Sequence, residues 1–187
     1  MKRRSGIQIM GKLIGLIRPL MHVMAAAILL GVTGYLCAIF LTVLAGVGIL
    51  QIMGIWQGAS LTTLFVCLAV IAVLRGILHY GEQACNHYIA FKLLALIRHK
   101  VFAALRKLCP AKLEGRDKGN LILIITTDIE LLEVFYAHTI SPIAIATLTS
   151  IIMVIFIGRY HWLAGVLALA AYLIVGVAIP MWNGKRG

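Results

Sequence analysis

The chain has 187 residues, of which 62% are hydrophobic and only 12% are charged. Globular domains are about 45–50% apolar, and a chain of this size cannot bury so large an excess in one core. The composition therefore excludes an ordinary soluble domain and a disordered chain. It predicts an all-α integral membrane protein.

The formal net charge of +11 is a feature that nucleic-acid-binding proteins share. Here, however, the basic residues stand between long apolar runs, which is where membrane proteins place them. We therefore expect the lipid bilayer, and no nucleic acid, among the partners.

Residues 1–19 and 20–187 differ in character. The first segment is short and amphipathic, and it predicts an elbow helix on the cytoplasmic membrane surface. The second predicts a membrane domain of about four spans. Its first span, 21–50, carries no charge and exceeds the ~20 residues that a bilayer requires. An uncharged loop follows, with Trp56 as an interfacial anchor.

The second span, 61–90, continues without a helix break into charged sequence. Residues 75–108 contain no proline, and their apolar residues keep a helical period. One helix over 61–108 would be about 70 Å long, whereas a hydrocarbon core is about 30 Å thick. We therefore expect a long helical extension into the cytoplasm, within a coupling region at about 91–130.

The third and fourth spans are expected at 134–158 and 162–180. Pro142 should bend the third helix. The segment Arg159–Trp162 should form a tight turn on the outer side, with aromatic anchors.

The distribution of Lys and Arg predicts the orientation. Five precede residue 19, eight lie between Lys92 and Lys118, and two lie in the C-terminal tail, against Arg159 alone on the outer side. The positive-inside rule then places both termini in the cytoplasm. We expect the protein in the plasma (inner) membrane.

No motif of a catalytic centre is present in the sequence. The only Gly-Lys pairs, at Gly11 and Gly184, lack the following Ser or Thr of a phosphate-binding loop. Neither H-E-x-x-H nor G-x-S-x-G occurs. We therefore expect no catalytic residue, no metal site and no enzyme activity in this chain by itself.

The second helix carries an unusual row of polar residues, which we call the polar face. Their spacings of four, three and four keep them within about 60° on a helix: Arg75, His79, Glu82 and Asn86. Gln83 and His87 flank them. Ionisable groups are costly at membrane depth, which favours a substrate pathway or a ligand site. The alternative is that Arg75 and Glu82 lie at the inner interface and pair or snorkel.

Two further features have a functional and a simpler interpretation. His87 could ligate a haem iron, although a hydrogen-bonded histidine is simpler. The charged turn after the long helix predicts a docking element, with a solvated loop as the alternative. The docking candidates are Glu114, Gly115, Arg116, Asp117, Lys118 and Gly119.

The long helix, its charged tip and the stretch that follows resemble the membrane domain of type 1 ABC exporters. The matching positions are Lys118-Gly119-Asn120-Leu121 and Thr126-Thr127-Asp128-Ile129. The resemblance implies that the tip is a coupling helix that docks on a nucleotide-binding domain. It also implies that this chain lacks two spans and the ATPase domain, which would bind ATP and Mg²⁺.

Within that family, Arg75–Glu82, Asn86-His87 and Ser141-Pro142 resemble the CydC-type half-transporters. This resemblance implies a second half-transporter as partner, export of small thiols, a tie to cytochrome bd assembly, and haem at His87. Two arginines of that group's pattern are replaced here by His79 and Gln83.

Three functions therefore stand as hypotheses from the sequence. The first is the membrane part of an ABC exporter. The second is a stand-alone membrane bundle that binds haem or serves as a partner subunit. The third is an ABC exporter of peptides or drugs.

Overall fold

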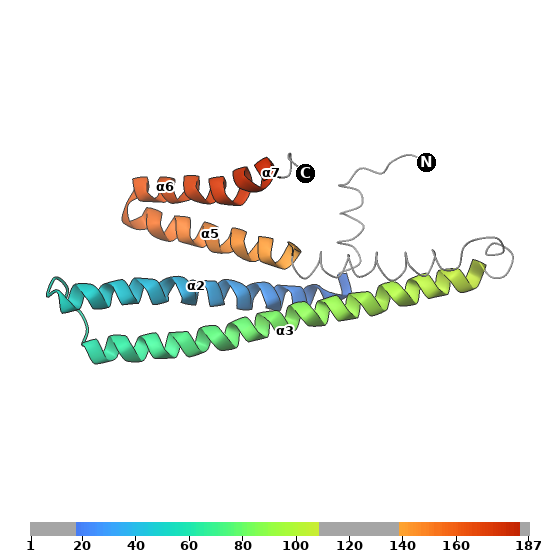
Figure 1. Cartoon of the computed structure of the whole chain (residues 1–187), viewed down its shortest axis with the longest axis horizontal. Coiled ribbons are helices and arrows are strands. Elements are labelled where there is room, and N and C mark those ends of the chain that lie inside the picture. The colour runs from blue at the N-terminus through green and yellow to red at the C-terminus, as the bar shows by residue number, and fades with distance from the viewer. Residues whose placement is uncertain (1–17, 109–138, 184–187) are drawn as a thin grey trace. The chain divides into compact units, whose positions relative to one another are not determined.

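A computed structural model describes residues 18–108 and 139–183, and these residues are almost entirely helical (Figure 1). Four of the described helices are long and apolar enough to cross a membrane. The expected all-α fold of about four membrane helices is thereby confirmed. The chain divides into two compact units, residues 1–142 and 143–187, which are described separately.

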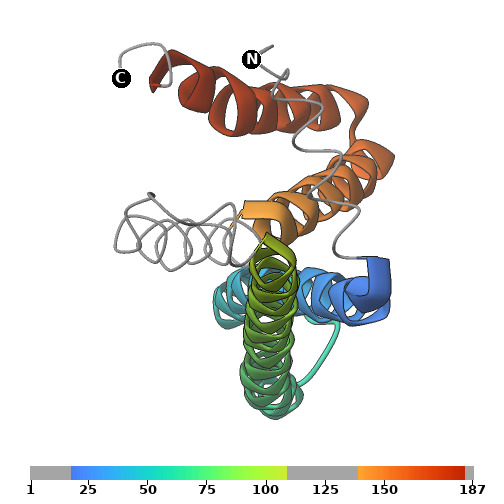
Figure 2. The same cartoon turned by 90° about the vertical axis from the view of Figure 1, so that its right-hand side faces the viewer.

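The first unit contains a long antiparallel helix pair. A short 3-10 turn, η1 (Arg18–Leu20), leads into α2 (Met21–Ile52), and α3 (Leu61–Leu108) returns beside it (Figures 1 and 2). The start of α2 packs against the middle of α3, where Leu20 and Met24 form a buried cluster with Ile89 and Leu93. This contact fixes which part of α3 lies opposite which part of α2.

The loop between α2 and α3 is short and apolar. Gly54 adopts a positive φ of 74°, a conformation that only glycine enters without strain. The Trp56 indole lies over Gly58, where a Cβ atom would overlap the ring. The chain therefore reverses within a few residues and keeps the two helices side by side.

The long second helix is continuous in the structure. α3 has 48 residues, which at 1.5 Å per residue is about 72 Å. Since a hydrocarbon core is about 30 Å thick, more than half of α3 lies outside it. The expected helical extension is therefore present as one element with the span.

The second unit is a helical hairpin that begins within the first turn of α5 (Ser141–Tyr160) and returns through α6 (Trp162–Leu173). His161 alone separates the two helices, so their turn is tighter than the expected Arg159–Trp162 segment. A Cβ atom on Gly165 would lie 2.7 Å from the Gly158 Cα atom. The two helices thus approach with backbone against backbone, as small residues allow in membranes.

Two prolines lie in these helices, one near the start of α5 and one in α7. Pro142 is the second residue of α5, and the two residues directly before this helix, Thr139 and Ile140, are π-helical. The expected bend at Pro142 stays a prediction. The fourth span is less regular than expected, because α6 passes into a π-helical segment, η3 (Ile174–Ala178), before α7 (Ile179–Asn183). Pro180 in α7 has no N–H to donate to the preceding turn, which is consistent with this irregularity.

Candidate functional site

The apolar length of the α2–α3 pair determines how deep its polar groups lie. No Lys, Arg, Asp or Glu occurs between Arg18 and Arg75. The 32 residues of α2 extend about 48 Å, and Arg75 lies about 21 Å from the start of α3. The hydrocarbon layer is about 30 Å thick. Wherever this layer lies along the length of α2, it includes the position of Arg75. Arg75 therefore lies at hydrocarbon depth.

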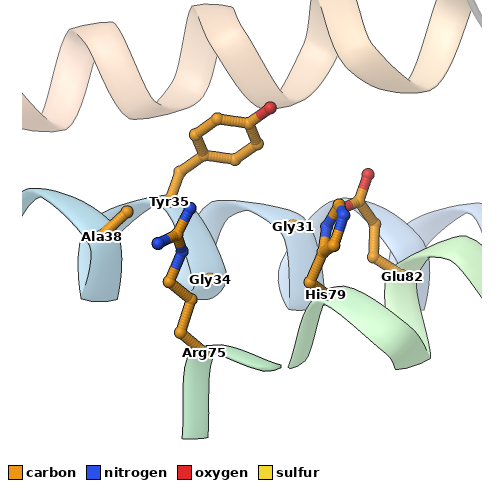
Figure 3. Close-up of a pocket in the computed structure, with 7 residues that line it drawn as sticks. All are labelled: Gly31, Gly34, Tyr35, Ala38, Arg75, His79 and Glu82. Carbon is orange, nitrogen blue, oxygen red and sulfur yellow. The ribbon is translucent and has the colours of Figure 1, made fainter. Parts of the chain in front are cut away.

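Three members of the polar face open onto a hollow of about 240 Å³ between α2 and α3 (Figure 3). We call it the α2–α3 hollow. α3 supplies its charged and polar wall, and α2 supplies the opposite wall. The lining residues are Gly31, Gly34, Tyr35, Ala38, Arg75, His79 and Glu82.

Small residues on α2 leave room for this hollow. Gly31 and Gly34 present no side chain, and Ala38 presents one methyl group. A Cβ atom on Gly34 would lie only 3.6 Å from the Leu78 Cβ atom, so the two helices approach closely there. The hollow thus combines tight backbone packing with space for long polar side chains.

Glu82 is the most engaged residue of the polar face. Its side chain is buried, with 5% of the residue exposed. Glu82 Oε2 lies 3.2 Å from His79 Nδ1, and Glu82 Oε1 accepts a hydrogen bond of 3.5 Å from Asn86 Nδ2. Each carboxylate oxygen therefore has a partner one helical turn away, which offsets the cost of burying it.

One interpretation of the sequence was that Arg75 pairs with Glu82, and the structure shows no such pair. Glu82 Oε2 instead lies within hydrogen-bond distance of His79 Nδ1. Within residues 18–108 and 139–183, Arg75 makes no hydrogen bond or ion pair. Figure 3 shows its guanidinium beside Gly34 and Tyr35, away from the Glu82 carboxylate.

The two flanking candidates lie outside the α2–α3 hollow. Gln83 is half-buried and does not line it. His87 is exposed, and its ring stacks on Phe91 with centroids 6.2 Å apart and planes at 23°. The structure thus places Arg75, His79 and Glu82 along one hollow, links Asn86 to Glu82, and leaves His87 apart from them.

The α2 wall was missed by reasoning from the sequence, although a signal for it exists. Ala27, Gly31, Gly34 and Ala38 follow one another at spacings of four, three and four. The polar face has the same spacings, so the two rows can lie opposite each other on antiparallel helices. The docking candidates from Glu114 to Gly119 lie outside the described residues.

The α2–α3 pair is uncharged from its start to Arg75, and it encloses a polar hollow at hydrocarbon depth. These two features are typical of a membrane protein that handles a polar solute or ligand. Residues 20–185 match the family described as the ABC transporter transmembrane region. The chain belongs to this family.

A curated relative extends this finding. The chain is 48% identical over 184 residues to a protein of Haemophilus influenzae named "Probable ABC transporter ATP-binding/permease protein". The match covers 98% of this chain and 33% of the relative. The chain therefore spans about a third of the length of the relative.

Proposed function

We propose that this chain is the membrane part of an ATP-driven ABC exporter, and that its polar face lines part of the translocation pathway. The observation that carries the proposal is the α2–α3 hollow, because charged side chains at hydrocarbon depth face water or a ligand rather than lipid. Membership of the ABC transmembrane family supplies the class of protein.

The proposed coupling runs through the far end of α3. This helix extends roughly 40 Å beyond a hydrocarbon core about 30 Å thick. It leads to the charged segment from Glu114 to Gly119, which would dock on an ATPase domain that binds ATP and Mg²⁺. The name of the relative, which joins ATP binding and permease in one protein, supports such a pairing.

The same proposal includes a second half-transporter, in a hetero- or homodimer. Rocking of the two halves would expose the hollow alternately to the two sides of the plasma membrane. On the CydC-type resemblance, the proposed substrate is a small thiol reductant, exported in support of cytochrome bd biogenesis. Peptides or drugs are the alternative substrate class.

Haem at His87 belongs to the second candidate function, a small bundle that acts without an ATPase. The exposed imidazole with Phe91 stacked on it is sterically free to ligate an iron. The test is a haem absorbance of the purified chain that disappears in His87→Ala and persists in His79→Ala. A chain purified with haem supplied and no such absorbance would exclude this role.

The exporter proposal is tested by co-purification with the ATP-binding part of the Haemophilus influenzae relative, expressed as a separate polypeptide. We expect a complex whose ATP hydrolysis depends on the charged segment from Glu114 to Gly119. Replacement of residues 115–119 by a Gly-Ser linker should abolish the complex or its ATPase stimulation. A loop replacement of equal length at residues 55–59, between α2 and α3, is the control and should preserve both. An unaffected complex after the tip replacement would contradict the docking role.

A further inference from the structure

We propose that the α2–α3 hollow binds the oxyanion group of a small solute, either a carboxylate or a phosphate, through the Arg75 guanidinium. The proposal rests on the exporter function above and adds the chemistry that the pathway recognises. Three observations support it: the state of Arg75, the supply of acidic residues, and the shape of the hollow.

The first observation concerns the Arg75 guanidinium and its surroundings in residues 18–108 and 139–183. The guanidinium makes no ion pair or hydrogen bond with the residues that the structure describes. A guanidinium presents five N–H donors in a rigid fork, which fits the two oxygens of a carboxylate or phosphate. An unpaired cation at hydrocarbon depth is costly, so the hollow favours a ligand that carries negative charge.

The second observation is that the helix pair itself has no free acid to neutralise Arg75. Glu82 is the only Asp or Glu before Glu114 in the sequence. Its two oxygens are already engaged by His79 and Asn86. The negative charge that Arg75 would bind therefore comes from outside α2 and α3.

The third observation is that the hollow separates its positive and negative groups. Arg75 lies at one end with Tyr35 and Ala38, and the His79–Glu82 pair lies at the other end (Figure 3). Seven residues of helix place Arg75 and Glu82 about 10 Å apart along the axis. An anion beside Arg75 would therefore avoid the Glu82 carboxylate.

The size of the hollow limits the solute. Its volume of about 240 Å³ is below the ~300–1,000 Å³ of sites for drug-sized ligands. The hollow thus fits a small solute, or the acidic end of a larger one.

The test uses trifluoroacetate as the probe and the full chain in phosphatidylcholine nanodiscs. Fluorine NMR of the probe should show saturable line broadening, and neutral trifluoroacetamide, which has nearly the same shape, should show none. Arg75→Gln should weaken the probe's affinity about tenfold or more, because charge-assisted hydrogen bonds are lost. The matched control, Arg159→Gln, removes an arginine in the last turn of α5 that does not line the hollow, and it should leave the affinity unchanged.

A second variant covers the case in which Arg75→Gln fails to fold. Ala38→Leu keeps Arg75 and fills its end of the hollow, so it should also weaken binding of the probe. Absence of saturable binding, or binding that both variants leave intact, would overturn the proposal.

Two comparisons separate the possible sources of the result. Binding seen in maltoside micelles but not in nanodiscs would assign the site to the phosphate of a lipid headgroup and overturn the solute assignment. The assay needs no ATPase, so a failure here leaves the exporter function standing. A failure of ATPase association leaves the oxyanion site standing in turn.

Discussion

Glu82 is the residue on which the polar face depends most for its order. Its carboxylate is buried and has one partner on each oxygen, both from its own helix. His79 at i−3 and Asn86 at i+4 therefore hold the Glu82 side chain of the polar face in place without a contact from α2. The opposite wall can then consist of glycine and alanine, which leaves the hollow open.

Removal of one partner of Glu82 should be measurable. Asn86→Ala leaves Glu82 Oε1 without its donor, and a buried acceptor without a partner costs about 1–3 kcal/mol. The length of this hydrogen bond, 3.5 Å, favours the lower end of that range. Reversible unfolding in detergent micelles measures the free energy. Gln83→Ala is the matched control, and an equal loss in both variants would contradict the role of Asn86.

At the residue scale, the sequence predicts the angular position of each group but not its partner. Helical periodicity places Arg75, His79 and Glu82 on one side of α3, and the structure agrees. Periodicity could not tell that Glu82 pairs with His79 rather than Arg75, because both lie on the same side. It also could not exclude Gln83 and His87, because their separation from the hollow depends on where α2 packs.

Among the elements, α3 combines a membrane span and an extension in one uninterrupted helix. Spin labels at Val70→Cys and Ala104→Cys, in a background without native cysteines, are 34 residues apart and should be about 51 Å apart. Electron–electron resonance should give one narrow distance near that value. A broad or clearly shorter distribution would show a break between the span and the extension.

The hairpin of α5 and α6 depends on close backbone contact at two glycines. Gly165→Ala places a Cβ atom 2.7 Å from the Gly158 Cα atom, so the helices must separate. Overpacking of this kind costs about 1–3 kcal/mol. Gly176→Ala is the control, since its Cβ atom would meet nothing within 4 Å. Thermal unfolding should therefore show a lower midpoint for Gly165→Ala alone, and equal midpoints would contradict the close contact.

The elements themselves were largely predictable, because length and hydropathy decide them. The first two helices begin where the sequence indicates, at Met21 after a proline and at Leu61 after an uncharged loop. The π-helical segment at Ile174–Ala178 was not predictable, since proline and glycine signal a break but not its hydrogen-bond pattern.

At the scale of the whole molecule, the distribution of charge predicts the topology. A cysteine in place of Gln57, an exposed residue of the loop between α2 and α3, should react with a membrane-impermeant maleimide from outside intact cells. A cysteine in place of Lys100, on the extension of α3, should react only after the membrane is opened. Both variants need a cysteine-free background. The reverse pattern would overturn the predicted cytoplasmic location of the termini.

The most direct measurement of the central claim, that the α2–α3 hollow belongs to a transport pathway, is the reactivity of a cysteine placed in it. Ala38→Cys lines the hollow, whereas Leu29→Cys on the same helix is exposed without lining it. Thiol modification requires the hydrated thiolate, so a water-soluble methanethiosulfonate should modify Ala38→Cys at least roughly tenfold faster. In a complex with an ATPase domain, trapping with ATP and vanadate should change the modification rate of Ala38→Cys and leave that of Leu29→Cys unchanged. Equal, slow and nucleotide-independent rates at both positions would contradict the account.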